Sequence, residues 1–142
     1  MSSYLFVGAP GSGKLAIAVD FAAALLCQDG GCGQCETCRS VTTLGHPDVL
    51  VFRRSGSNLE ISEAREIVQL AQTRPQFGGF RVIIVPEMHR GVHVSSTLLK
   101  IVEEPPVTTI FLLTAEGIDR ALEPLASRCV RISVPRPERA TV

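Results

Sequence analysis

Short apolar runs recur along the chain, separated by glycine, proline and polar residues. Five of these runs have the length of buried strands and are rich in Val, Ile, Leu and Phe. Most of them are apolar at consecutive positions, which is typical of parallel strands that are covered on both faces. The strands are predicted at residues 4–7, 49–52, 81–85, 109–114 and 130–134.

Helical segments alternate with the predicted strands. The second should stop at Gly45, and the third has Ser62 as its predicted N-cap. The third should also stop near Thr73, because Pro75 disfavours helical geometry in the residue before it. The alternation predicts an α/β fold, a three-layer sandwich in which helices cover both faces of a five-stranded parallel sheet. The helices are predicted within residues 14–26, 36–44, 62–73, 95–104 and 118–126.

Composition changes this picture little. The chain has 142 residues, which favours one domain, and it is 45% hydrophobic and 20% charged, as is ordinary for a soluble globular protein. Its 14 basic and 14 acidic residues balance, so any contact with DNA would need a local patch or partner proteins. No apolar run reaches the roughly 18 residues that span a bilayer, and the N-terminus lacks the basic region of a signal peptide. We therefore expect a cytoplasmic protein.

A glycine-rich loop lies between the first predicted strand and the first predicted helix. Residues 8–14 read G-x-x-x-x-G-K, the pattern of a phosphate-binding loop. Its glycines let successive backbone N–H groups converge on phosphate oxygens, and the helix N-terminus adds partial positive charge. A glycine-rich turn with no ligand is the alternative. The candidate nucleotide-binding residues are Gly8, Pro10, Gly11, Ser12, Gly13 and Lys14.

The groups that usually hold magnesium in such sites are missing. Leu15 stands where a Ser or Thr would follow the lysine, and Val85 and Pro86 stand where an acidic pair would end the third strand. Glu87 is either a shifted substitute for that pair or an exposed loop carboxylate. We therefore expect that ATP or ADP could still rest on the loop but that Mg²⁺ is not held. Hydrolysis should be slower by orders of magnitude.

Four of the five cysteines lie close together in the sequence. Their spacing is C-x4-C-x2-C-x2-C, and glycines between them allow the tight backbone that a metal knot needs. Structural Zn²⁺ is the predicted ligand, with redox chemistry or an iron–sulfur cluster as alternatives. Cys129 lies far along the chain and is predicted to be a small buried residue rather than a fifth ligand. The candidate metal ligands are Cys27, Cys32, Cys35 and Cys38.

Further motifs follow in a fixed order. Residues 46–48 read His-Pro-Asp, residues 98–106 read LLKIVEEPP, and residues 127–129 read Ser-Arg-Cys. With the phosphate loop and the cysteine knot, this order resembles the clamp-loader AAA+ ATPases of bacterial DNA polymerase III. The resemblance implies a P-loop NTPase domain over residues 1–142, with a zinc-binding insertion at about 27–38. It also implies that Arg128 is an arginine finger, which acts in trans on ATP bound by a neighbouring subunit.

Two branches of this family differ in their nucleotide sites. The gamma/tau subunits hydrolyse ATP, whereas delta prime subunits often have a defective site, so Leu15, Val85 and Pro86 favour a delta prime-like stator. Ala115 agrees, since it stands where the ATPases tend to have a polar residue, although Thr114 is one position away. The resemblance then implies a subunit that is not itself an active ATPase and that helps load the sliding clamp on primed DNA.

The implied partners are the gamma/tau and delta subunits, the sliding clamp and, through the complex, primer-template DNA. The lid and collar domains that usually follow in this family are expected to be absent. Two other functions are considered: an active gamma/tau-like ATPase that uses Lys14 and Glu87, and a truncated zinc-bearing interaction fragment. Glu103 and Glu104 are predicted to have only a structural role, at the end of their helix.

Overall fold

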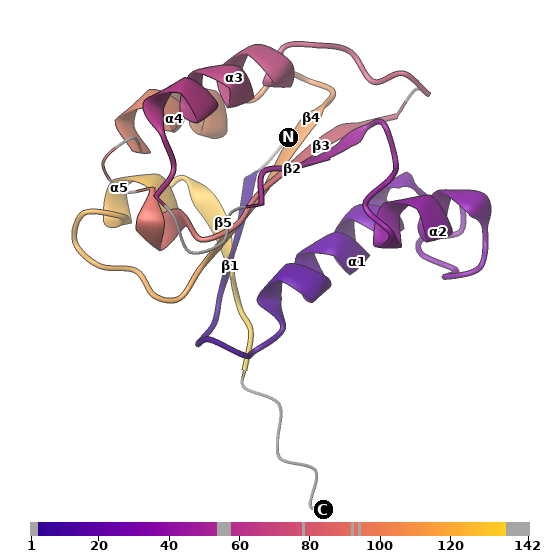
Figure 1. Ribbon diagram of the computed structural model, residues 1–142, viewed down its shortest axis with the longest axis horizontal. Helices are drawn as coiled ribbons and strands as arrows, with labels where there is room; N and C mark the ends of the chain where they lie inside the picture. Colours follow the sequence, from indigo (N-terminus) through magenta and orange to yellow (C-terminus); the bar gives the residue numbers. More distant parts are fainter. Residues whose placement is uncertain (1–2, 54–57, 78, 92, 94, 136–142) are drawn as a thin grey trace, which may run out of the picture.

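Five strands form one parallel sheet in the order β2-β3-β4-β1-β5 (Figure 1). The computed structural model describes residues 3–53, 58–77, 79–91, 93 and 95–135. The predicted number of strands and their parallel direction are confirmed. The strands are β1 Ser3–Val7, β2 Val49–Val51, β3 Arg81–Val85, β4 Thr109–Ala115 and β5 Cys129–Ser133.

Helices cover both faces of the sheet, as predicted. One layer is built by α1 and α2, and the other by α3, α4 and α5 (Figure 1). A short 3-10 helix, η1, follows β3. The helices are α1 Lys14–Leu26, α2 Glu36–Thr42, α3 Ile61–Ala71, η1 Met88–Arg90, α4 Ser95–Glu103 and α5 Glu123–Ala126.

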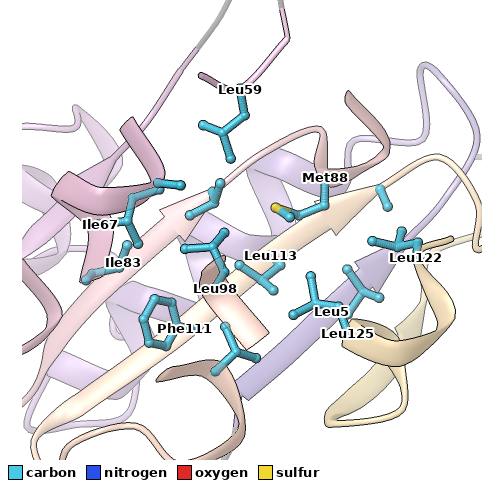
Figure 2. Packing of buried hydrophobic residues seen from close by; sticks show 14 of the residues in the cluster. Leu5, Leu59, Ile67, Ile83, Met88, Leu98, Phe111, Leu113, Leu122 and Leu125 are labelled. Carbon is cyan, nitrogen blue, oxygen red and sulfur yellow. The ribbon is translucent and has the colours of Figure 1, made fainter. Parts of the chain in front are cut away.

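The sheet separates two apolar cores. Val82 and Ile84 of β3 pack in the core under α1, whereas Ile83 and Val85 pack in the core under α3, α4 and α5. Successive side chains of a strand point to opposite faces, so a strand buried on both faces must be apolar at every position. Figure 2 shows the second core, in which Phe111 lies near side chains of the helices.

Helix boundaries differ from the predictions where local hydrogen bonds decide them. The N-cap of α3 is Glu60 rather than Ser62, because Glu60 and Glu63 form a capping box in which each side chain accepts a backbone N–H of the other residue. At the end of α2, Leu44 rather than Gly45 adopts the left-handed conformation, with φ 61°. Chain reversal therefore begins before the glycine that was expected to cause it.

A buried carboxylate ties the loop that precedes β3 to the start of β2. Asp48 is 1% exposed and accepts the backbone N–H groups of Gln76 at 2.6 Å and Phe77 at 3.0 Å. The guanidinium of Arg81 lies 3.7 Å from the same carboxylate and donates to the carbonyl of Arg74 at 2.6 Å. The Asp of the His-Pro-Asp motif thus has a structural role.

Candidate functional site

The loop between β1 and α1 has the backbone geometry of an anion cradle. Gly11 and Gly13 have φ of 81° and 80°, in the left-handed region that glycine adopts without strain. Gly13 is also the N-cap of α1, and no side chain caps that helix end. The first N–H groups of α1 are therefore left for a ligand to bind, at the end where the helix dipole favours negative charge.

Gly8 fixes how closely the loop packs on the sheet. A Cβ at this position would lie 2.5 Å from Ser12 Oγ and 2.8 Å from the carbonyl oxygen of Val134. The N–H of Gly8 donates to the carbonyl of Ala115 at 3.1 Å, which holds the loop against the end of β4. Pro10 lies exposed on the loop, and Ser12 is buried beneath it, with no partner for its hydroxyl among the described residues.

A cavity of about 320 Å³ lies beside this loop. It is located at the carboxyl ends of the parallel strands, where ligands bind in open α/β sheets. Lys14 contributes the expected cation, and Leu15 contributes an apolar side chain where a metal-binding hydroxyl was expected. The full lining comprises Gly11, Gly13, Lys14, Leu15, Ala16, Arg53, Pro86, Glu87, Thr114 and Glu116.

The acidic residues of the cavity have basic side chains beside them. Glu87 pairs with the guanidinium of Arg90 at 3.2 Å, and a carboxylate oxygen of Glu116 lies 3.4 Å from Nε2 of His89. Glu87 also adopts a left-handed backbone, with φ 57°. The structure therefore places Glu87 at the cavity, as the shifted-substitute interpretation requires, but ties its carboxylate to a neighbouring guanidinium.

The polar residue that β4 contributes to the cavity is Thr114. Its hydroxyl accepts the backbone N–H of Glu87 at 3.0 Å. Ala115 is fully buried in the core under α3, α4 and α5, so of the two positions that the sequence left open, Thr114 is the one that lines the cavity. The reason is the alternation of a strand, which turns neighbouring side chains to opposite faces.

The four clustered cysteines converge in space. Their sulfur atoms all lie within 4.8 Å of one another, and the sulfurs of Cys27 and Cys35 are 3.8 Å apart. A tetrahedral Zn²⁺ with Zn–S bonds of about 2.3 Å would hold its sulfurs about 3.8 Å apart. Cys27 follows α1 and Cys35 is the N-cap of α2, so the cluster joins the ends of two helices. These four residues could hold a metal ion.

Backbone N–H groups aimed at sulfur favour the thiolate form in part of the cluster. The N–H of Cys32, with those of Gly31 and Asp29, lowers the pKa of Cys27 to about 6. The N–H groups of Gln34 and Cys35 likewise lower the pKa of Cys32. These contacts suit metal coordination, because the thiolate is the form that binds.

Cys38 and Cys129 behave differently. The N–H of Gly33 acts to lower the pKa of Cys38, but burial and the neighbouring sulfurs outweigh it and raise that pKa to about 12. Burial raises the pKa of Cys129 to about 11. Cys129 packs at the margin of the core under α3, α4 and α5, and it lies outside the cluster of four.

Arg128 and the phosphate loop lie at opposite ends of the parallel strands. It precedes the amino end of β5, whereas the loop follows the carboxyl end of β1, and these strands pair in parallel from Ser3↔Cys129 to Val7↔Ser133. A strand of five residues is about 17 Å long, so Arg128 does not reach the cavity of its own chain. Its side chain is 34% exposed and pairs with Glu103 at 2.9 Å.

Sequence reasoning missed two features of these sites. Arg53, which belongs to none of the motifs, lines the cavity together with Lys14. The pairing of Glu103 with Arg128 joins motifs 25 residues apart, which no local pattern indicates. Within the described part of the chain, no helix is long and apolar enough to cross a membrane.

Comparisons with known proteins agree on one family. Residues 1–138 match a family model described as "DNA polymerase III, delta subunit". The chain is 34% identical over 142 residues to DNA polymerase III subunit delta' of Pseudomonas aeruginosa, covering 95% of this chain and 43% of that protein. It is 33% identical over 134 residues to subunit tau/gamma of Haemophilus influenzae, covering 91% of this chain and 19% of that protein.

A solved structure shows the same fold. The crystal structure of a DNA polymerase III gamma subunit-related protein from Thermotoga maritima superposes with a TM-score of 0.70 at 22% identity. The match covers 96% of this chain and 42% of that one. The chain thus spans less than half the length of these relatives.

Proposed function

Because this chain belongs to the DNA polymerase III delta subunit family, we propose that it acts as a delta prime-like stator of the clamp loader. In this role it helps load the sliding clamp on primed DNA and does not hydrolyse ATP itself. Its partners are the gamma/tau and delta subunits and the clamp, and it meets primer-template DNA through the complex. The observation that carries the proposal is a phosphate loop in which Leu15 follows the lysine and Val85 and Pro86 end β3, at the positions where the magnesium-holding groups would stand.

The nucleotide cavity supports binding better than catalysis. Phosphoryl transfer depends on positioning and on charge stabilisation by Mg²⁺, which in P-loop enzymes needs a hydroxyl after the lysine and an acidic residue at the end of a strand. Here Leu15 lines the cavity at the first of these positions, and the buried residues Val85 and Pro86 occupy the second. Lys14 remains to contact phosphate, so ATP or ADP is a ligand without being a substrate.

Arg128 serves a nucleotide held by a neighbouring subunit. Arg128 is too far from the cavity of its own chain to contact a phosphate there, so the phosphate must come from a second chain. Its side chain is partly exposed, so the guanidinium is accessible to that chain. A guanidinium binds phosphate oxygens through its planar fork and keeps its charge at any physiological pH. Arginine fingers supplied in trans raise turnover by roughly 10³- to 10⁵-fold in enzymes that use them.

The cysteine cluster holds a structural Zn²⁺ within the P-loop domain. Cys27, Cys32, Cys35 and Cys38 supply four thiolates, the donor set of closed structural zinc sites. The ion cross-links the end of α1 to the start of α2, because its ligands flank both helix ends. The cluster therefore stabilises the insertion at about 27–38 and takes no part in phosphate chemistry.

An active gamma/tau-like ATPase is the second candidate. It is favoured by Glu87 and Thr114, which both line the cavity opposite Lys14. In this case Glu87 would have to leave Arg90 and act as the acid that the strand end lacks. The two candidates differ in what they predict for the isolated chain, since only the second hydrolyses ATP alone.

ATP turnover distinguishes the two candidates. The full-length protein should show no hydrolysis above background on its own. In the complex reassembled with its partner subunits, Arg128→Ala should lower ATP turnover strongly, whereas Lys14→Ala should leave it nearly unchanged. Arg65→Ala is the matched control, because Arg65 is an exposed arginine on α3. Substantial turnover by the isolated protein that disappears in Lys14→Ala would establish the ATPase instead.

A further inference from the structure

The guanidinium of Arg128 is held by its own chain on one side. Its Nε donates to Glu103 at 2.9 Å, and its Nη1 donates to the backbone carbonyl of Pro124 at 2.6 Å. Glu103 is the last residue of α4, and Pro124 belongs to α5, which packs against α4. Two separate helices therefore fix the direction of one arginine.

The remaining nitrogen of the guanidinium, Nη2, is left open by the described residues, on a side chain that is 34% exposed. An arginine carries five N–H donors on three nitrogens. Nε and Nη1 have the partners just described, and Nη1 also lies 3.4 Å from the hydroxyl of Ser127. Nη2 has no partner in the part of the chain that the structure describes. The anchored arginine thus presents Nη2 to an acceptor from outside the chain.

We propose that Glu103 is a positioning residue for Arg128. Its carboxylate holds the Nε side of the guanidinium, so that Nη2 is presented to a phosphate oxygen of a nucleoside triphosphate bound by the adjacent subunit. This inference rests on the proposed function of Arg128. It also assigns a role to the first glutamate of the LLKIVEEPP segment, which by sequence alone belonged only to a helix end.

The physical basis is orientation rather than stability. A free arginine side chain samples many rotamers, and ordering it in advance removes that entropic cost from the reaction. Glu103 and Arg128 are 49% and 34% exposed, and exposed ion pairs contribute little to folding. Loss of Glu103 should therefore leave the protein folded and lower the turnover number of the neighbouring site.

Glu104 provides a matched control. It is the next residue along the chain, is exposed, and carries the same charge at the same helix end. Among the described residues it has no ion pair, so its replacement changes the net charge equally without releasing Arg128. Any difference between the two positions then reports the contact with the guanidinium.

The test is steady-state ATP hydrolysis by the complex assembled from the full-length protein and its partners. Glu103→Ala should lower kcat about tenfold while KM changes less than about twofold, because orientation acts on the reacting state rather than on ATP binding. Glu103→Gln keeps an oxygen that can accept from Nε, so it should recover most of the activity. Glu104→Ala should match the wild type.

A second measurement uses the isolated protein. In ¹H–¹⁵N spectra the Nε–H signal of Arg128 should be rigid in the wild type and in Glu104→Ala, and mobile in Glu103→Ala. If Arg128→Ala leaves turnover of the complex unchanged, the finger function fails and this inference fails with it. If Arg128→Ala lowers kcat but Glu103→Ala leaves it unchanged or raises it, only the positioning role is overturned. A mobile wild-type signal also overturns it.

Discussion

Replacing Asp48 with alanine tests how the loop before β3 is held. The carboxylate is 1% exposed, and it accepts two backbone N–H groups, from Gln76 and Phe77. Arg81, which lies 3.7 Å away and is 6% exposed, has no other carboxylate within salt-bridge distance among the described residues. Asp48→Ala removes two charge-assisted hydrogen bonds and leaves a buried cation without its counter-charge.

The expected loss follows from these contacts. Hydrogen bonds to charged groups contribute about 1.5–3 kcal/mol each, and removing one half of a buried ion pair costs about 3–5 kcal/mol. Gln76 and Phe77 are exposed residues, so water recovers part of the loss, and Arg81 keeps its bond to the carbonyl of Arg74. We therefore expect about 3 kcal/mol, the lower end of that range. For a domain of this size the melting temperature should fall by about 9 °C.

Urea unfolding followed by far-UV circular dichroism measures this change. The zinc concentration must be held constant, because a metal bound only to the folded state adds to apparent stability. Asp20→Ala, at an exposed position on α1, should change stability by less than about 0.5 kcal/mol. Adding Arg81→Met to Asp48→Ala should restore part of the loss, since no buried charge then remains. A loss below about 1 kcal/mol in Asp48→Ala would refute the reasoning.

Four further predictions concern the cysteine cluster, the end of β4 and the phosphate loop. Chelation of the metal should lower the melting temperature. In the metal-free protein the free energy of unfolding should rise from about pH 6 to pH 9. In this range Cys27 is ionised in the folded state, where its pKa is about 6, but protonated in the unfolded state, where its pKa is the ordinary 9.0. Above pH 9 the free energy of unfolding should fall again, because Cys38 keeps its proton up to about pH 12 only in the folded state. Urea titrations across this pH range that show no maximum in stability would contradict both directions. Thr114→Val should cost about 1–2 kcal/mol in the same assay, because a backbone N–H loses its acceptor, whereas Thr114→Ser should cost much less. Gly8→Ala should lower the melting temperature by several degrees, because the added Cβ would crowd a backbone carbonyl oxygen. The control Gly117→Ala adds a Cβ that meets nothing within 4 Å and should be nearly neutral. Equal effects of the two substitutions would refute the crowding at Gly8.

Local patterns in the sequence were sufficient for most of the fold. Continuous apolar runs identified β3 and β4 because a strand covered on both faces has no solvent-facing position to mark with a polar residue. The prediction of two covered faces was wrong for β5, which forms an edge of the sheet and exposes Arg131 and Ser133. The phosphate loop and the cysteine cluster could also be predicted, since each is built within a few residues of continuous chain. The N-cap of α3 was mistaken because glutamate is an uncommon cap, and only its reciprocal bonding with Glu63 places it at Glu60.

Tertiary structure decided the contacts between distant segments. The sequence indicated Arg128 through its motif, but the carboxylate that holds it comes from α4, and its separation from the chain's own cavity comes from the parallel pairing of β1 and β5. The sequence also left open whether Thr114 or Ala115 lines the cavity beside the phosphate loop, and the pleat of β4 settled it by turning Thr114 to the cavity and Ala115 to the core. Residue types and spacing determine which groups are present and which local turns they form. Which of these groups meet depends on how helices and strands pack, and that packing is not encoded in any single stretch of chain.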